Sequence, residues 1–372
     1  MARLLLLDIF QWFAILMGLT SYRFRADELI QTPLTRGYTL IVNVILVTLL
    51  PVVVIATKIT WVNMWLPSYM WLTPIVLYVV NYAVIVQTLI ARAQRDSLLM
   101  ELHRLIVQLN GEMERAGKQM SAKLRRLFYA KSLTLTYLFL CYVLGACLYD
   151  GQFTLPMWLA SVLLNNGYTV LIATPHLYFV SFWHVARGYD FVNQQLAELI
   201  ATRSPLAAGY AKELRSLWSL HARLSRMAHK LNRIYGRQML ASRFDFVAFT
   251  IINSYLGIVF SLSKPAPFYA KVYGALLCST RTMDFFMTDY ICDLVARYQS
   301  KPQHNISEGI MRKELSSFVI YQHSMTLNLK VCGLFPVNRR ESLNMMAAIL
   351  CHSVLLLQYH LMMSAKRERQ LQ

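Results

Sequence analysis

Residues 38–57 read YTLIVNVILVTLLPVVVIAT and contain no charged side chain. A helix of about 20 mostly apolar residues is long enough to cross the hydrocarbon core of a bilayer. Six further stretches are apolar over a similar length, although the one that starts at Phe268 becomes charged toward its end. They are Trp71–Ala91, Phe128–Tyr149, Ser161–Ala186, Phe244–Leu262, Phe268–Leu294 and Leu343–Met363. The sequence therefore predicts an all-α polytopic membrane protein with seven transmembrane helices.

The composition agrees with this class. Hydrophobic residues make up 56% of the 372 residues and charged residues only 15%, with a mean hydropathy of +0.40. A soluble domain has about a quarter of its residues charged. The net charge of +18 would suggest a nucleic-acid partner in a soluble protein, but in a membrane protein such an excess belongs to cytoplasmic loops. We expect the lipid bilayer as a partner, and no nucleic acid.

The positions of lysine and arginine predict the orientation. Segments 21–37, 92–127, 187–243 and 293–342 hold 28 of the 37 basic residues, and they alternate with short segments that carry few. Because basic loops stay in the cytoplasm, the N-terminus is expected inside and the C-terminus outside. This orientation is the reverse of that of a G-protein-coupled receptor. The glycosylation sequon at Asn305 falls in a cytoplasmic segment and should be unused.

A shorter apolar stretch occupies residues 4–19. It lacks the small-residue cleavage site of a signal peptide, and Asp8 interrupts it. We expect this stretch to re-enter the membrane; the alternative is a further span that places Met1 outside.

Two cytoplasmic segments carry apolar seams at helical spacing. The first is a heptad pattern made by Leu217, Leu220, Leu224, Met227, Leu231 and Ile234. The second lies in residues 313–332 and consists of Leu315, Phe318, Val319, Met325 and Leu329. These seams predict a cytoplasmic helical assembly region in which they bury each other. An amphipathic helix on the membrane surface is the alternative for the second.

The last apolar helix has a marked start. Asn338 can cap it, and Glu341 three residues later completes a capping box. Within the span, Gln358 must face either a partner helix or water. Leu355 and Tyr359 share its face, so these residues form a plausible constriction of a pore.

The end of the chain resembles that of the insect gustatory receptor family, which closes with Thr-Tyr, five apolar residues and Gln-Phe. Here the segment reads Cys351-His352, then Ser353-Val354-Leu355-Leu356-Leu357, then Gln358-Tyr359. Gln358 matches, Tyr359 is a conservative replacement, and the first pair departs from the pattern. Upstream, residues 333–338 (GLFPVN) resemble the Gly-Leu-Phe segment of the family. The spans, the orientation and the chain length also agree.

The resemblance implies a function. It implies a homo- or heterotetramer, formed with itself or with related gustatory receptors, in which four copies of the last helix surround a cation pore lined by Leu355, Gln358 and Tyr359. The expected activity is that of a tastant-gated, non-selective cation channel in the plasma membrane of gustatory neurons, tuned to aversive (bitter) compounds.

A small-molecule tastant needs an apolar pocket with a few polar groups. Aromatic residues in the outer halves of the middle helices meet this description, with ordinary packing and interfacial anchoring as the alternative. The candidates are Tyr78, Tyr82, Tyr142, Tyr149, Tyr168 and Tyr273. In Phe268–Leu294, Arg281 and Asp284 are spaced to form a structural ion pair, or else lie on an ion pathway.

Enzyme and transporter functions are the rival classes. The six cysteines are scattered, and the sequence has no metal-binding His motif and no phosphate-binding glycine loop, so we expect no catalytic residue, metal or cofactor. A transporter would often show broken-helix repeats, which are not evident. The expected division of the chain is residues 1–186 (re-entrant segment and four spans), 187–243 (cytoplasmic helical extension), 244–294 (fifth and sixth spans), 295–337 (cytoplasmic amphipathic helix) and 338–372 (pore-lining helix and extracellular tail).

Overall fold

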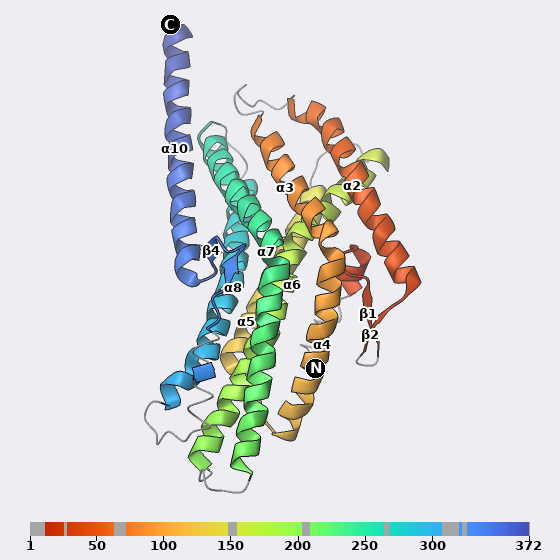
Figure 1. The fold of residues 1–372 in the computed structure, drawn as a ribbon. Helices are drawn as coiled ribbons and strands as arrows, with labels where there is room; N and C mark the ends of the chain where they lie inside the picture. Colours follow the sequence, from red (N-terminus) through yellow and green to blue (C-terminus); the bar gives the residue numbers. More distant parts are fainter. Residues whose placement is uncertain are drawn as a thin grey trace.

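The structure is a computed structural model, and it describes residues 12–25, 28–62, 72–147, 155–202, 209–263, 268–306, 320–321 and 326–371. Long helices form a bundle, with two small β-hairpins at its surface (Figure 1). The elements are β1 (Tyr22–Arg25), β2 (Glu28–Gln31), α2 (Pro33–Val62), α3 (Leu72–Ile90), α4 (Arg92–Arg115), α5 (Ala122–Cys147), α6 (Leu155–Thr202), α7 (Tyr210–Ser263), α8 (Phe268–Ile306), β3 (Lys330–Val331), β4 (Phe335–Pro336) and α10 (Arg339–Leu371).

Each of the seven predicted spans lies on one of these helices, namely α2, α3, α5, α6, α7, α8 and α10, which confirms the predicted fold class. Among the described residues, two helices hold a window that is apolar enough to cross a bilayer by composition alone, Pro33–Ile55 and Arg339–Met363. The direction in which the helices cross the membrane stays a prediction.

Two of the helices, α6 and α7, are much longer than a bilayer is thick. α6 has 48 residues and α7 has 54, so they measure roughly 72 and 81 Å at 1.5 Å per residue. α6 continues past residue 187, and α7 begins well before residue 244, without a break in either helix. The predicted cytoplasmic region is therefore built largely from extensions of the spanning helices, with α4 packed beside them.

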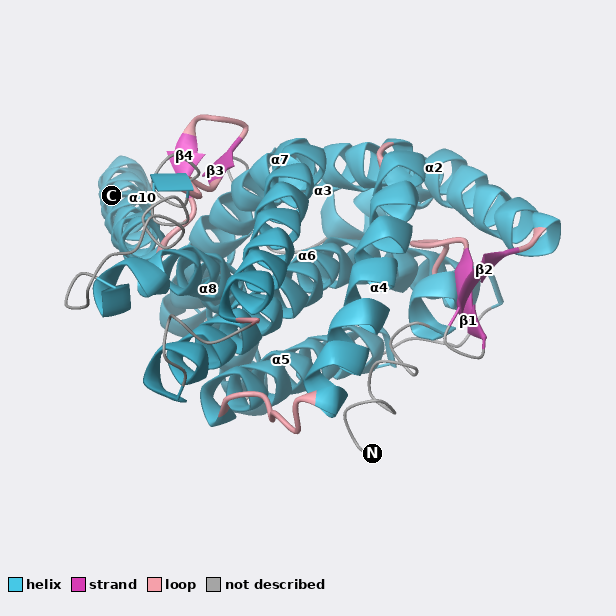
Figure 2. Cartoon of the chain, turned by 60° about the horizontal axis from the view of Figure 1, so that its bottom comes forward, coloured by secondary structure: helices cyan, strands magenta, loops and turns pink. Residues whose placement is uncertain are grey.

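The main core lies among these extensions. It joins α4, α5, α6, α7 and α8 around large buried side chains such as Phe128, Tyr178 and Trp183. The indole N–H of Trp183 donates a hydrogen bond to the carbonyl of Leu124 at 3.0 Å. In Figure 2, which is turned by 60° from the view of Figure 1, α6 lies near the centre, whereas α2 and α10 lie at opposite edges.

The apolar seam of α7 is used within the chain. Leu220, Leu224, Met227 and Leu231 are buried in the main core. A Cβ atom added to Gly188 of α6 would lie only 2.6 Å from Cδ2 of Leu224. α6 therefore approaches the seam too closely for any other helix to occupy it, and the seam is not a free surface for subunit assembly.

The prediction of a helix over residues 313–332 is wrong for the final part of that segment. Residues 326–329 lie outside any helix, and β3 follows them. Leu327, Leu329 and Val331 are buried while the residues between them are exposed, which is the period-two pattern of an extended chain. These three side chains join the main core, so this segment does pack with the α7 seam, although as a strand. Leu315, Phe318, Val319 and Met325 lie outside the described residues.

The N-terminal part forms a short helix over residues 12–16 and the hairpin β1–β2, which the sequence did not reveal. It is held against α4 by polar contacts. The guanidinium of Arg95 donates to the carbonyl of Leu19 at 2.6 Å, and the Ser21 hydroxyl donates to Asp96 at 2.8 Å. Residues 1–11, which hold half of the predicted re-entrant stretch, lie outside the described residues.

Candidate functional site

The start of α10 is fixed by local hydrogen bonds. Asn338 Oδ1 accepts a hydrogen bond from the backbone N–H of Glu341 at 2.8 Å, which is the geometry of an N-cap. The guanidinium of Arg339 lies 2.9 Å from Asp293 of α8. The hairpin β3–β4 leads directly into this turn, and the backbone N–H of Val337 donates to the carbonyl of Leu329 at 2.9 Å.

α10 presents two different faces. Ser342, Ile349 and Ser353 recur at helical spacing and are buried against the bundle. Leu355 and Tyr359, with exposed fractions of 57% and 49%, and the exposed Gln358 lie away from that stripe. The three predicted pore residues thus occupy the side of α10 that its own chain leaves open.

The outer half of α10 touches the bundle through a polar pair. Nδ1 of His360 lies 3.3 Å from the hydroxyl oxygen of Tyr255 on α7, and the two rings meet edge to face. Between Arg339 and Met363, only Ser342, Ile349 and Ser353 are buried among the described side chains. Figure 1 shows the consequence: α10 stands at the edge of the bundle, and its C-terminal end rises beyond α7.

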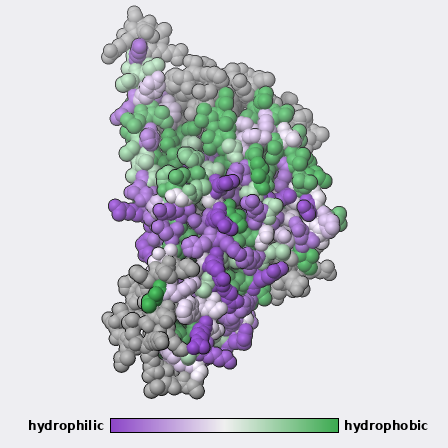
Figure 3. Space-filling view, viewed as in Figure 1, coloured by the Kyte–Doolittle hydropathy of each residue, from purple (hydrophilic) through white to green (hydrophobic). Residues whose placement is uncertain are grey.

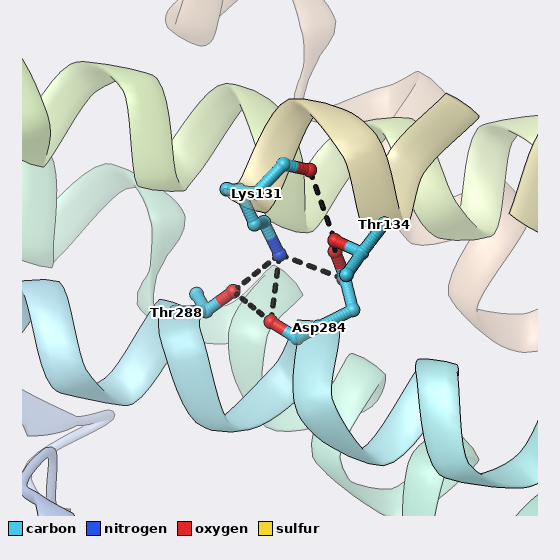
Figure 4. A network of polar contacts seen from close by, with 4 residues as sticks. All are labelled: Lys131, Thr134, Asp284 and Thr288. Atoms are coloured by element: carbon cyan, nitrogen blue, oxygen red, sulfur yellow. Dashed lines mark hydrogen bonds and ion pairs between the residues drawn. The ribbon is translucent and has the colours of Figure 1, made fainter. Parts of the chain in front are cut away.

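The charges of α8 find partners on neighbouring helices. Lys131 of α5 lies 2.7 Å from Asp284 and donates a hydrogen bond to Thr288 at 2.8 Å, and Thr134 also donates to Asp284 (Figure 4). Arg281 forms an ion pair with Asp245 of α7. Arg281 and Asp284 therefore form ion pairs with other helices, and the expected pair between the two of them is wrong. The cross-helix partners fit a structural role for both residues.

A second link of this kind joins α7 to α8. The guanidinium of Arg243 forms an ion pair with Asp289, and both side chains are almost fully buried. The sequence showed charges in this part of α8, but their partners lie far away in the chain and left no local signal. Together these contacts make α8 the helix to which α5, α7 and α10 are tied.

Three of the six tyrosines proposed for ligand binding come together. Tyr78 and Tyr82 of α3 stack with ring centroids 6.1 Å apart, and Tyr168 of α6 packs against the same cluster of buried residues. The Tyr82 hydroxyl donates to the carbonyl of Val47 on α2 at 2.8 Å. Tyr142 and Tyr273 lie in α5 and α8, and Tyr149 lies outside the described residues.

Polar atoms of these helices remain unsatisfied. The Tyr78 hydroxyl, Asn81 Oδ1 and Asn166 Oδ1 are buried and have no hydrogen-bond partner among the residues that the structure describes. Buried polar groups are normally paired, so such atoms are where a bound molecule would find hydrogen bonds. Asn81 and Asn166 were missed in the sequence, where an asparagine inside an apolar run was the available signal.

Within the described ranges, no group of three or more His, Cys, Asp or Glu side chains is placed to hold a metal ion. The fold is a helical bundle, of the class expected for a polytopic membrane protein, with a peripheral last helix and a polar, aromatic cluster between α2, α3 and α6. The sequence model of the 7tm Chemosensory receptor family matches residues 7–363, and the chain belongs to that family. Because this is a receptor family, the enzyme alternative is excluded.

Curated relatives agree with this assignment. Gustatory receptor 59b of Drosophila erecta is 46% identical over 301 residues, which cover 80% of this chain and 51% of that protein. A gustatory receptor for bitter taste, 22e, of Drosophila melanogaster is 23% identical over 55% of this chain and 56% of its own length. The chain thus spans about half the length of the curated relatives it matches.

A solved structure has the same fold. The insect olfactory receptor OR5 from Machilis hrabei, in complex with eugenol, superposes with a TM-score of 0.63 over 96% of this chain and 99% of its own. The sequence identity is only 10%, so this similarity concerns the arrangement of the helices.

Proposed function

We propose that this chain is a gustatory receptor that acts as a tastant-gated, non-selective cation channel in the plasma membrane of gustatory neurons. Four subunits, identical or related, would place their α10 helices around a central pore. Leu355, Gln358 and Tyr359 would line or gate that pore. The proposed orientation puts Asn338 in the cytoplasm and the C-terminal tail outside.

The observation that carries the proposal is the open face of α10. A helix that is long enough to cross a bilayer and contacts its own bundle along one stripe leaves its other side for lipid or for further subunits. Leu355 alone would suit lipid, but Gln358 on the same side would leave an amide unsatisfied in hydrocarbon. A water-filled path between subunits satisfies that amide.

The ligand is proposed to be a small, largely apolar molecule with hydrogen-bonding groups. The cluster of Tyr78, Tyr82 and Tyr168, with its unpaired polar atoms, offers the matching chemistry. The name of the bitter-taste relative supports an aversive compound as the tastant. The eugenol in the olfactory receptor complex is a molecule of the expected kind.

Currents from cells that express only this chain, screened with bitter compounds, test the proposal. Gln358→Ala is expected to change conductance or ion selectivity. Ser353→Ala is the matched control, because Ser353 faces the bundle and its hydroxyl bonds to its own helix at Ile349. Unchanged permeation in Gln358→Ala would remove the pore assignment, and a strictly stoichiometric flux would indicate a transporter. A glycan on Asn305 would invert the orientation.

A further inference from the structure

The hairpin β3–β4 lies along α7 at the base of α10. The Asn232 side chain of α7 donates a hydrogen bond to the carbonyl of Lys330 at 3.0 Å. One turn further on, a Cβ atom added to Gly236 would come within 3.4 Å of the backbone nitrogen of Cys332. The hairpin is therefore seated on two successive turns of α7, and this contact fixes which side chains of α7 lie beside it.

The two segments that meet at this contact carry three exposed basic side chains. Arg233 and Arg237 directly follow Asn232 and Gly236 on α7, and Lys330 projects from β3; all three are exposed. None of them forms an ion pair or a side-chain hydrogen bond with a residue that the structure describes. Nearby cations differ, because Lys230 is paired with Glu101 at 2.6 Å and Arg339 with Asp293.

The tip of the hairpin is apolar. Cys332 and Gly333 adopt positive φ angles of 50° and 75°, which reverse the chain and turn the next two residues outward. Leu334 is 65% exposed and Phe335 50% exposed. Large apolar side chains next to unpaired cations are characteristic of surfaces that lie in the interfacial region of a membrane.

The position of the hairpin along the bundle agrees with a place in the interfacial region of the membrane. On α10 the exposed apolar surface begins at Leu343, one turn after the helix starts, and on α7 it begins at Phe244, roughly 10 Å beyond Arg237. Figure 3 shows this boundary as a hydrophilic band directly below the hydrophobic upper part of the molecule. In the proposed orientation the band faces the cytoplasmic leaflet, which carries the anionic lipids.

We propose that Arg233, Arg237 and Lys330 form a binding site for the head group of an anionic phospholipid, with Leu334 and Phe335 inserted beside it. Guanidinium groups bind phosphate oxygens through two parallel hydrogen bonds, and the lysine adds a point charge. The inference rests on the proposed function only for the side of the membrane that this surface faces.

Native mass spectrometry of the purified full chain in mixed micelles tests the site. The probes are dioleoyl phosphatidylserine and dioleoyl phosphatidylcholine at equal concentration. The wild type is expected to retain phosphatidylserine preferentially. Each cation near an anionic group strengthens binding on the order of fivefold, so the variant Arg233→Gln/Arg237→Gln/Lys330→Gln should lose that preference on the order of a hundredfold.

The control variant is Arg104→Gln/Lys212→Gln/Arg226→Gln, which removes the same charge from exposed positions farther from the apolar surface. It should keep the preference. An unchanged preference in the first variant, or an equal loss in the control, overturns the proposal. So does a first variant that changes only the oligomeric state, because the surface is then a contact between copies. A micelle does not distinguish the two faces of a membrane, so an inverted orientation of the chain would leave this result unchanged. The inverted orientation would be detected separately, as a glycan on Asn305.

Discussion

The ammonium group of Lys131 lies 2.7 Å from Oδ2 of Asp284, and the Lys131 side chain has no solvent exposure. The two residues are separated by 153 positions in the chain and come from α5 and α8, which pack side by side. A buried ion pair is costly to break on one side only, because the remaining charge stays in a medium of low dielectric constant.

Replacing Lys131 by Met is therefore expected to destabilise the protein by about 3–5 kcal/mol. The double variant Lys131→Met/Asp284→Leu should recover much of this loss, since the hydroxyls of Thr134 and Thr288 also bond to their own helices. Thermal unfolding of the purified protein measures both effects. The control is Lys230→Met, which breaks an exposed pair and should cost less than about 1 kcal/mol. If the double variant is no more stable than Lys131→Met, the pair is not the source of the loss.

Tyr255→Phe should loosen the outer half of α10. It removes the hydroxyl that lies 3.3 Å from His360, and hydrogen bonds between membrane helices contribute roughly 1 kcal/mol. Because this polar contact links α7 to the exposed half of α10, we expect a shift in the tastant concentration that gives half-maximal current. Dose–response recordings measure it, with Tyr129→Phe, which alters an exposed tyrosine on α5, as the control. A Tyr255→Phe curve that overlays the wild type would contradict this link.

The cap at the start of α10 can be tested by substitution of Asn338. Asn338→Ala removes the acceptor for the Glu341 N–H and should cost about 1 kcal/mol of stability, whereas Asn338→Asp or Asn338→Ser should retain most of it. Asn344→Ala, at an exposed position in the second turn of α10, is the control. Thermal unfolding again provides the readout. Equal losses in Asn338→Ala and Asn338→Ser would argue against a capping role.

Stability is expected to fall in mild acid because of His221. This residue lies in the predicted cytoplasmic part of α7, where burial lowers its pKa from 6.5 to about 4, only partly offset by the carbonyl of Gln299. Between these two pKa values the unfolded chain binds a proton that the folded chain does not. The contribution of His221 is therefore complete above about pH 7 and decreases down to about pH 4, by at most roughly 3 kcal/mol.

Thermal unfolding at pH 7.5, 6 and 5 measures this dependence. His221→Gln should flatten the pH profile over that range, whereas His229→Gln, at an exposed position on the same helix, should leave it unchanged. A wild-type profile that is already flat from pH 7.5 to 5 would show that protonation of His221 does not limit stability.

The seven helices and the start of α10 were predictable from the sequence because both depend on local properties. An uncharged run such as residues 38–57 is long enough to cross a bilayer whatever surrounds it, and an asparagine at residue 338 can reach only the N–H groups of the turn that follows it. The same reasoning placed Leu355, Gln358 and Tyr359 on one face of α10 by spacing alone, whereas only the packing of the bundle shows that this face is open.

Other features were decided by tertiary structure. Asp284 binds Lys131 because α5 and α8 pack together, and no local pattern states which distant lysine will lie opposite a given carboxylate. Tyr78 and Tyr168 likewise meet only because α3 and α6 are neighbours. The α7 seam was predicted to pack against the seam of residues 313–332, but its packing against α6 depends on Gly188, which allows α6 to come close.

Residues 327–331 show most clearly what could not be predicted from the sequence. The segment contains apolar residues at spacings that suit either a helix or a strand, and it became extended because the surface of α7 receives Leu327, Leu329 and Val331 on alternate positions. The sequence by itself determined the helices that cross the membrane and their local ends, since hydrophobic length and capping act within one segment. The tertiary structure alone decided which charges, aromatic rings and strands meet, because those energies arise only between segments that folding brings together.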